Sequence, residues 1–216
     1  MTTPALSRLR HYRHRRRHEV ATERRSLPNH EPFNGRSIRL LPGEFYATGA
    51  QDEMIVTVLG SCVAACIRNP YTGYGGMNHF MLPESESGDW NGASAALRYG
   101  NHAMEALIST VLRSGCSRRD LEIKLFGGAN LTVGPAMIGE MNAIFALRYT
   151  ADEGLNIGAA DLGGTLGRRI HYVPATGAVR RVFLVHGRDR SVLQNERDYA
   201  STLDRMPVEG SIELFD

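Results

Sequence analysis

The sequence predicts a layered α/β (α+β) domain, and three observations support this fold class. Short β-prone runs alternate irregularly with longer runs of helical period, which is typical of packed layers of sheet and helix. Two pairs of the β-prone runs flank dense turn signals and are expected to form hairpins. The 216 residues are 42% hydrophobic and 22% charged, enough for the core of one soluble domain with an extension.

The extension is predicted to be the N-terminal segment, residues 1–36. It holds nine arginines against three glutamates, a net charge of +6 within a chain of +2, so residues 37–216 carry −4. With little apolar surface to bury, such a segment is expected to stay disordered. Attraction to nucleic acid, an acidic membrane or an acidic receptor surface is one interpretation, and a solvated extension or a misplaced start codon is the other. Residues 37–216 are then a single domain.

The first β-prone runs of the domain lead to one cysteine. The predicted strand Met54–Leu59 is followed directly by Gly60, Ser61 and Cys62. The predicted strands of this half are Ile38–Leu41, Glu44–Thr48, Met54–Leu59, Val63–Ile67 and Met77–Leu82.

The last two of these strands flank Asn69–Gly73, whose proline and glycine indicate a turn. Paired residues in an antiparallel hairpin have a constant number sum, here about 142, which places Cys62 within a residue or so of His79. Side chains paired in this way lie roughly 5 Å apart at Cβ, so a thiol and an imidazole there can act as nucleophile and base. A slip of one residue would separate them onto opposite faces.

Residues around Cys62 supply the remaining parts of such a site. Gly60 allows close approach of backbone and substrate, and the backbone N–H groups of Ser61 and Cys62 are candidates for an oxyanion hole. Thr57 lies five residues upstream of Cys62 and is the candidate to orient the second nitrogen of His79. A small buried thiol and a structural histidine are the alternative interpretation.

The second half continues the alternation of helix and strand. Its predicted elements are a polar loop at Glu84–Gly92, a helix at Ser94–Ser114, a strand at Leu121–Phe126, a helix at Gly134–Leu147, a strand at Ile157–Ala160 followed by a turn at Asp161–Gly164, a hairpin of Arg168–Val173 with Val179–Val185, and a helix at Val192–Leu203.

Two features of this half are candidates for substrate binding. Trp90 is the only tryptophan and lies in the polar loop, where it binds a partner or anchors the loop. Gly127 and Gly128 follow a strand, but neither phosphate-loop pattern is present. In an amidase, these glycines are expected to let backbone approach the reaction centre.

Composition also bears on location and cofactors. No apolar run approaches the roughly 18 residues of a membrane span, and no apolar region follows the basic N-terminus, so we expect a cytoplasmic protein. The three cysteines, Cys62, Cys66 and Cys116, do not suggest a disulfide framework. A zinc site built from them and His79 lacks the usual ligand spacing, and we expect no metal.

The sequence resembles the CheD family of chemoreceptor glutamine deamidases. TVLGSC is followed, seventeen residues after its cysteine, by the histidine of GGMNHFMLP, and KLFGGA, IGEMN, DLGG and GRRIHYVPATG follow in the family's order. The likeness extends from about Leu41 to Leu203. It implies a sandwich of sheets with outer helices, as in deamidating bacterial toxins. It also implies Cys62 as nucleophile, His79 as base and Thr57 as the third member.

The same resemblance implies a function in chemotaxis. Such an enzyme converts glutamines of methyl-accepting chemoreceptors to glutamates through a thioester, releases ammonia, and needs no cofactor. Hydrolysis of methyl-glutamate esters is a possible side activity. A CheC-type phosphatase is a possible partner, nucleic acid is not expected, and membrane contact is indirect through receptors. The alternatives are another thiol amidohydrolase, such as a peptidase or transglutaminase-like enzyme, and a non-catalytic module that binds receptors or a phosphatase.

Overall fold

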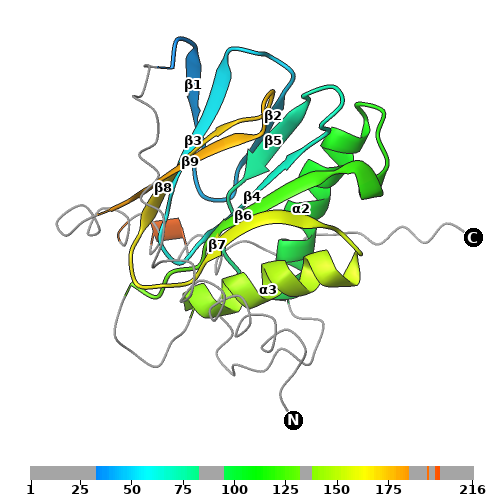
Figure 1. Ribbon diagram of the computed structural model, residues 1–216. Coiled ribbons are helices and arrows are strands. Elements are labelled where there is room, and N and C mark those ends of the chain that lie inside the picture. Colours follow the sequence, from blue (N-terminus) through cyan, green and yellow to red (C-terminus); the bar gives the residue numbers. More distant parts are fainter. Residues whose placement is uncertain (1–32, 83–94, 132–137, 185–193, 195–197, 200–216) are drawn as a thin grey trace, which may run out of the picture.

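The computed structural model describes residues 33–82, 95–131 and 138–184, together with residues 194, 198 and 199. Most of the predicted basic tail, the loop with Trp90 and most of the predicted terminal helix lie outside these residues. Two sheets pack face to face and two helices cover the second sheet, which makes three layers (Figure 1). The predicted α+β layered fold class is confirmed.

The first layer, here called the outer sheet, has the strand order β1-β3-β8-β9. Its strands are β1 (Arg36–Arg39), β3 (Glu53–Leu59), β8 (Arg168–Val173) and β9 (Ala178–Phe183). β1 runs parallel to β3, whereas the other two pairs are antiparallel. Buried and half-buried residues alternate along the whole of β3, so one face of this sheet packs inward and the other faces away.

The second layer, the central sheet, has the order β2-β5-β4-β6-β7. Its strands are β2 (Phe45–Thr48), β5 (Gly75–Asn78), β4 (Val63–Arg68), β6 (Glu122–Gly127) and β7 (Ile157–Leu162). β6 and β7 are parallel and the remaining pairs antiparallel. In β4 every residue except the last is buried, so both of its faces are covered, as its continuous run of small and apolar side chains suggests.

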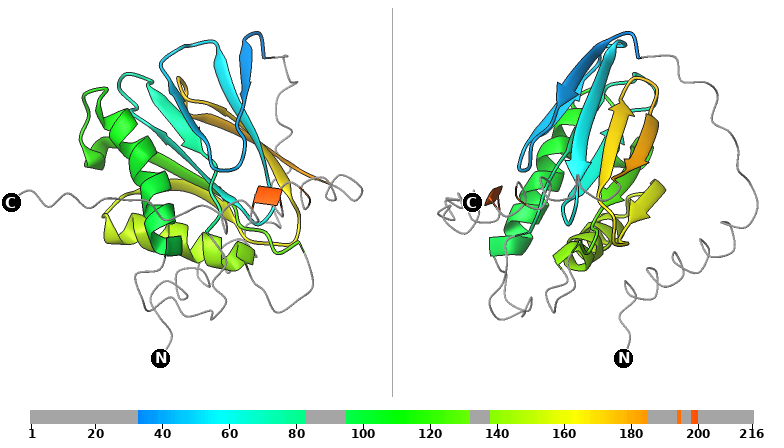
Figure 2. Two further views of the ribbon diagram at one scale, coloured as in Figure 1. Left: turned by 180° about the vertical axis from the view of Figure 1, so that it is seen from behind. Right: turned by 90° about the vertical axis from the view of Figure 1, so that its left-hand side faces the viewer.

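The third layer consists of α2 (Ala95–Leu112) and α3 (Ile138–Asp152), on the side of the central sheet away from the outer sheet (Figure 2). A short 3-10 helix, η1 (Arg118–Asp120), precedes β6. No helix within the described ranges is long and apolar enough to cross a membrane.

Alternate residues of the central strands fill two separate cores. Val63, Ala65 and Ile67 point to the helices and pack in one core with residues such as Leu107 and Phe145. Cys62, Ala64 and Cys66 point the other way, into a core shared with the outer sheet. The period of two in β4 therefore decides which residues meet the outer sheet, and Cys62 is one of them.

Both predicted hairpins are present, but several boundaries differ from the sequence prediction. The strand predicted at Ile38–Leu41 is Arg36–Arg39, the strand predicted at Met77–Leu82 ends at Asn78, and the helix predicted to end at Leu147 continues to Asp152. β7 continues through Asp161 and Leu162, which were expected to form a turn, because they pair with Phe126 and Gly127 of β6. β5 begins at Gly75, before the predicted start at Met77. A Cβ at Gly75 would lie 2.7 Å from the carbonyl oxygen of Ile67, and one at Gly76 would lie 2.2 Å from that of Tyr46. The β-poor glycines thus join the strand because only they allow this close pairing.

Candidate functional site

Three strands bring the predicted catalytic residues to one end of the two packed sheets. Cys62 directly precedes β4 and His79 directly follows β5, both in the central sheet. Thr57 lies in β3 of the outer sheet, at one of its inward positions. All three are almost fully buried, with relative exposures of 0% for Cys62, 2% for His79 and 1% for Thr57. The site therefore lies between the layers.

The register of the β4–β5 hairpin places Cys62 and His79 on the same face. Paired residues such as Cys66 and Met77, and the bridge between Val63 and Phe80, have number sums of 143, close to the predicted 142. The residue opposite Cys62 is then Met81, two positions from His79. An offset of two keeps the side chains on one face as diagonal neighbours, whereas an offset of one would have separated them.

The loop of the hairpin explains this register. The N–H of Asn69 donates to the carbonyl of Tyr74 at 2.8 Å, and the N–H of Gly73 donates back to the carbonyl of Asn69 at 2.9 Å. Asn69 and Tyr74 therefore close the loop as a pair with a number sum of 143, which moves its centre half a residue beyond the one that the proline and glycine alone suggested.

Thr57 holds the ring of His79 and selects its tautomer. The Thr57 hydroxyl lies 2.9 Å from the carbonyl oxygen of Leu40 and 2.8 Å from His79 Nδ1. A carbonyl oxygen can only accept, so the single hydroxyl hydrogen goes to Leu40, and Thr57 must accept from His79 Nδ1–H. The proton on Nδ1 leaves Nε2 with its lone pair, which is the form that a general base requires.

Burial keeps this imidazole neutral. The loss of hydration lowers the pKa of His79 from an ordinary 6.5 to about 3, because the charged ring is disfavoured away from water. Nε2 is itself buried and has no hydrogen-bond partner among the described residues. At neutral pH the site thus contains an uncharged base whose accepting nitrogen is not used by the fold.

Gly127 and Gly128 hold the turn that carries Cys62. The N–H of Gly128 donates to the carbonyl of Cys62, and that of Ala129 to the carbonyl of Gly60, both at 2.8 Å. Gly127 has a φ of 113°, and a Cβ there would lie 2.1 Å from the carbonyl oxygen of Cys62. These contacts fit the expectation that the glycines allow close approach beside the cysteine, and contact with substrate stays a prediction.

Asn142 of α3 ties the two halves of the hairpin end together. Its side-chain amide donates to the carbonyl of Ser61 at 2.9 Å and accepts from the N–H of Leu82 at 2.9 Å. Ser61 precedes Cys62 and Leu82 lies three residues beyond His79, so one fully buried side chain spans both flanks of the site. A polar residue in an otherwise apolar helical stripe was the only sequence signal for this role.

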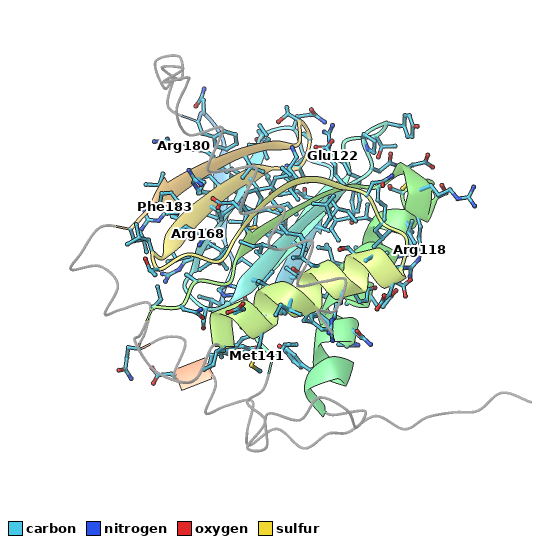
Figure 3. All side chains as sticks on the ribbon, turned by 60° about the horizontal axis from the view of Figure 1, so that its bottom comes forward. Arg118, Glu122, Met141, Arg168, Arg180 and Phe183 are labelled. Carbon is cyan, nitrogen blue, oxygen red and sulfur yellow. The ribbon has the colours of Figure 1, made fainter. Side chains whose placement is uncertain are left out.

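Arg168 supports the glycine turn from the outer sheet (Figure 3). Its buried guanidinium donates to the carbonyls of Asp161 and Gly163 and pairs with the Asp161 carboxylate at 3.2 Å. The N–H of Gly163 in turn donates to the carbonyl of Gly127 at 2.8 Å. Asp161 also pairs with Arg181, so its carboxylate anchors this loop.

Two phenols lie on the Cys62 side of the site. Tyr99 of α2 and Tyr199 pack against the core that contains Cys62, and their hydroxyl groups are in contact. A Cβ on Gly43 would lie 2.5 Å from the Tyr199 hydroxyl, so this tyrosine covers the chain between β1 and β2. Burial, and to a smaller extent the nearby Cys62, raises the pKa of Tyr99. Sequence reasoning did not foresee Tyr199.

A pocket of about 490 Å³ is lined in part by His79 and Thr57. It lies against strands of the outer sheet and the chain segment 40–42 that follows β1. Its wall includes Arg39, Arg169 and His171 as well as apolar side chains of β3. Within the part of the chain that the structure describes, no cluster of three or more histidine, cysteine or acidic side chains is arranged to hold a metal ion.

Comparison with known proteins places this geometry in context. The family model described as "CheD chemotactic sensory transduction" matches residues 81–182. A protein of Rhodopseudomonas palustris is 50% identical over 183 residues, covering 85% of this chain and 86% of the relative. One of Halorhodospira halophila is 45% identical over 192 residues, covering 87% of each, and one of Methylobacillus flagellatus is 44% identical over 186 residues, covering 85% and 91%. Each of these three bears the name "Probable chemoreceptor glutamine deamidase CheD".

Proposed function

Because this chain belongs to the CheD family, we propose that it is a protein-glutamine deamidase that converts glutamine side chains of chemoreceptors to glutamates during chemotactic adaptation. The observation that carries the chemistry is the relay from Leu40 through Thr57 to His79, which leaves an accepting nitrogen on the face of the central sheet that carries Cys62. A thiol beside a neutral, oriented imidazole is the arrangement that acyl transfer by a cysteine nucleophile needs.

The reaction begins with attack of Cys62 sulfur on the side-chain amide carbon of glutamine. His79 Nε2 takes the thiol proton, and the carbonyl oxygen becomes an oxyanion that the N–H groups of Ser61 and Cys62 stabilise. The imidazolium returns the proton to the amide nitrogen, the C–N bond breaks, and ammonia leaves a thioester behind. Burial of His79 disfavours a resting ion pair, so proton transfer accompanies attack and does not precede it.

Hydrolysis of the thioester completes the cycle. His79 Nε2 removes a proton from water, the hydroxide adds to the thioester carbon, and the C–S bond breaks. The sulfur regains its proton, and the substrate leaves as glutamate. The overall change is amide plus water to carboxylic acid plus ammonia, with neither metal nor redox partner consumed. Thr57 contributes by holding the ring in the reactive tautomer through both halves of the cycle.

The direct test compares the wild-type chain with Cys62→Ala, using Cys116→Ala as the matched control. We expect ammonia release and conversion of receptor glutamines, read by mass spectrometry of receptor peptides, to disappear only in the Cys62 variant. A peptidase would instead cut the receptor, and a binding module would support adaptation equally well without the thiol. Full deamidation by a folded Cys62→Ala protein would refute the mechanism.

Location and further partners follow from the proposed substrate. Receptor segments that carry modifiable glutamines lie in the cytoplasm, so this protein is proposed to act there. A CheC-type phosphatase is the second proposed partner. Pull-down of purified phosphatase by the full chain, in the presence and absence of receptor, tests whether the two compete.

A further inference from the structure

The face of the outer sheet that points away from the central sheet has a distinctive composition. Register and burial assign its members, here called the outer face: Ser37 and Arg39 of β1, Met54, Val56 and Val58 of β3, Arg169, His171 and Val173 of β8, and Ala178, Arg180 and Val182 of β9. A half-buried strip of β3 runs along it, beside more exposed positions of β1, β8 and β9. Such a surface is apolar enough to dock a partner.

The charged side chains of the outer face are all arginines, so every one of these charges is positive. Arg39, Arg169 and Arg180 are exposed, and none forms an ion pair with a residue that the structure describes. Two of these arginines also affect the histidine that lies between them. Burial, followed by the charges of Arg180 and Arg169, lowers the pKa of His171 between them. Three cations that form no ion pair with the described residues, beside apolar side chains, favour an acidic partner.

The outer face is also hollowed toward the candidate catalytic residues. The residues that line the pocket of about 490 Å³ include Arg39, Arg169 and His171 of the outer face as well as His79 and Thr57. A partner seated over this pocket therefore lies near the candidate catalytic residues. Figure 3 shows Arg180 on the β9 side of the molecule and Met141 on α3 at the opposite side, so the helical layer lies away from this surface.

We infer that the outer face docks an acidic, amphipathic segment of the chemoreceptor substrate beside the site. This inference rests on the proposed deamidation. Each turnover turns a neutral amide into a carboxylate, so a substrate segment with several sites grows more acidic as the reaction proceeds, and a basic surface keeps hold of it. The sequence of the N-terminal segment 1–36 has a net charge of +6, so its charge does not complement this face. If two copies of this chain paired through the outer face about a twofold axis, arginines would face arginines. Such a dimer is disfavoured by repulsion between like charges.

The test compares two double charge reversals that change net charge equally. Arg169→Glu with Arg180→Glu alters the outer face, and Arg119→Glu with Arg148→Glu alters exposed positions on η1 and the helical layer. Both pairs are made in full-length chain carrying Cys62→Ala, so that binding is measured without turnover. The probe is a purified receptor cytoplasmic domain with its glutamines intact, and thermal melts verify folding of every variant.

The outer-face variant is expected to bind the receptor domain at least about tenfold more weakly, because like charges now face each other, while the control pair binds as the parent does. Parental binding should also weaken as ionic strength rises from about 0.1 to about 1 M, which shortens the screening length from about 10 to about 3 Å. Equal binding by the two double variants would overturn the assignment. The assignment would also be overturned if a DNA duplex of random sequence competed with the receptor domain equally well. It would be overturned too if the outer-face variant lost self-association and kept its receptor binding.

A separate measurement distinguishes this inference from the proposed reaction. Wild-type chain is assayed for ammonia release from a short neutral glutamine peptide and from the receptor domain. If neither is deamidated while receptor binding responds to the outer-face reversal, the proposed reaction fails and the docking surface stands. If both are deamidated and the reversal changes nothing, the docking surface fails and the reaction stands.

Discussion

Thr57 has a single hydroxyl hydrogen, and the fold commits it to the carbonyl oxygen of Leu40 at 2.9 Å. The tautomer of His79 follows from that commitment, because the hydroxyl oxygen then accepts from Nδ1–H. Sequence placed Thr57, Cys62 and His79 in one site, but it gave no information about Leu40, which acts through its backbone. Every residue has a main-chain carbonyl, so the sequence cannot indicate which one accepts from Thr57, and this hydrogen bond is seen only in the structure.

Replacing Thr57 separates the hydroxyl from the shape of its side chain. Thr57→Val removes the acceptor for Nδ1–H and frees the ring to change tautomer, and we expect kcat for ammonia release to fall about tenfold or more. Thr57→Ser keeps the hydroxyl and should retain most of the rate. Steady-state kinetics of both variants across pH provide the measurement, and equal rates for valine and serine would refute the assigned role.

Burial of His79 also links stability to pH. Above an ordinary pKa of 6.5 the ring is neutral in both folded and unfolded chain, but between 6.5 and about 3 only the unfolded chain takes up the proton. Stability contributed by the neutral buried ring is therefore complete above pH 6.5 and lost as pH falls, by about 1.4 kcal/mol per pH unit. Urea unfolding at several pH values should show a shallower acid loss in His79→Gln. An identical slope would contradict the lowered pKa.

At the scale of elements, the Cys62 turn is held from three directions. Gly128, which follows β6, donates to Cys62, and Asn142 of α3 donates to Ser61. β7 supports β6 through the loop that Arg168 binds. The hairpin of β4 and β5 was predictable because its turn residues and apolar runs are local. The parallel pairing of β1 with β3, and the extension of β7 through Asp161, depend on partners distant in sequence and were not predictable from local pattern.

The glycine turn offers a controlled substitution. Gly127→Ala puts a Cβ 2.1 Å from the carbonyl oxygen of Cys62 at a φ of 113°, so the cysteine turn must shift. Gly154→Ala is the matched control, since its φ of 64° is also positive but no atom lies within 4 Å of the added Cβ. We expect a modest loss of thermal stability in both, and loss of activity only in the first. Comparable activity in the two variants would show that the turn tolerates displacement.

Asn142 can be tested by removing one of its two hydrogen bonds or both. Asn142→Asp keeps an acceptor for the Leu82 N–H but sets a carboxylate against the Ser61 carbonyl, whereas Asn142→Leu loses both bonds. Each buried group left unsatisfied costs about 1–3 kcal/mol, so both variants should unfold at lower urea concentration. If Asn142 positions the Cys62 turn, kcat falls in whatever folded protein remains. Unchanged kcat with lowered stability would limit Asn142 to a structural role.

At the scale of the whole molecule, the layers bury Cys62 together with His79. Cys62 is 0% exposed, and the tyrosine pair of Tyr99 and Tyr199 packs against its core. The layered fold class was predictable because β-prone runs alternate along the chain with runs of helical period. The position of the site between two sheets was not, because it depends on which face of β4 each sheet covers. A protein substrate therefore needs this region to open.

Alkylation of the cysteines measures that opening. In free protein we expect slow reaction of Cys62 with iodoacetamide, because a buried thiol must first become accessible. Added receptor domain should accelerate modification of Cys62 while Cys66 stays protected and half-buried Cys116 reacts at an unchanged rate. Peptide mapping by mass spectrometry resolves the three positions. Rapid alkylation of Cys62 without receptor would contradict a closed resting site.

The difference in burial between the outer face and the candidate catalytic residues has a practical consequence for altering this protein. Cys62, His79 and Thr57 are almost fully buried between the two sheets, so exchanges there put the fold at risk. Arg169 and Arg180 of the outer sheet are exposed, which makes them the positions to vary. A library varied only at those surface positions is the natural starting point for redirecting the same hydrolysis to a different acidic client.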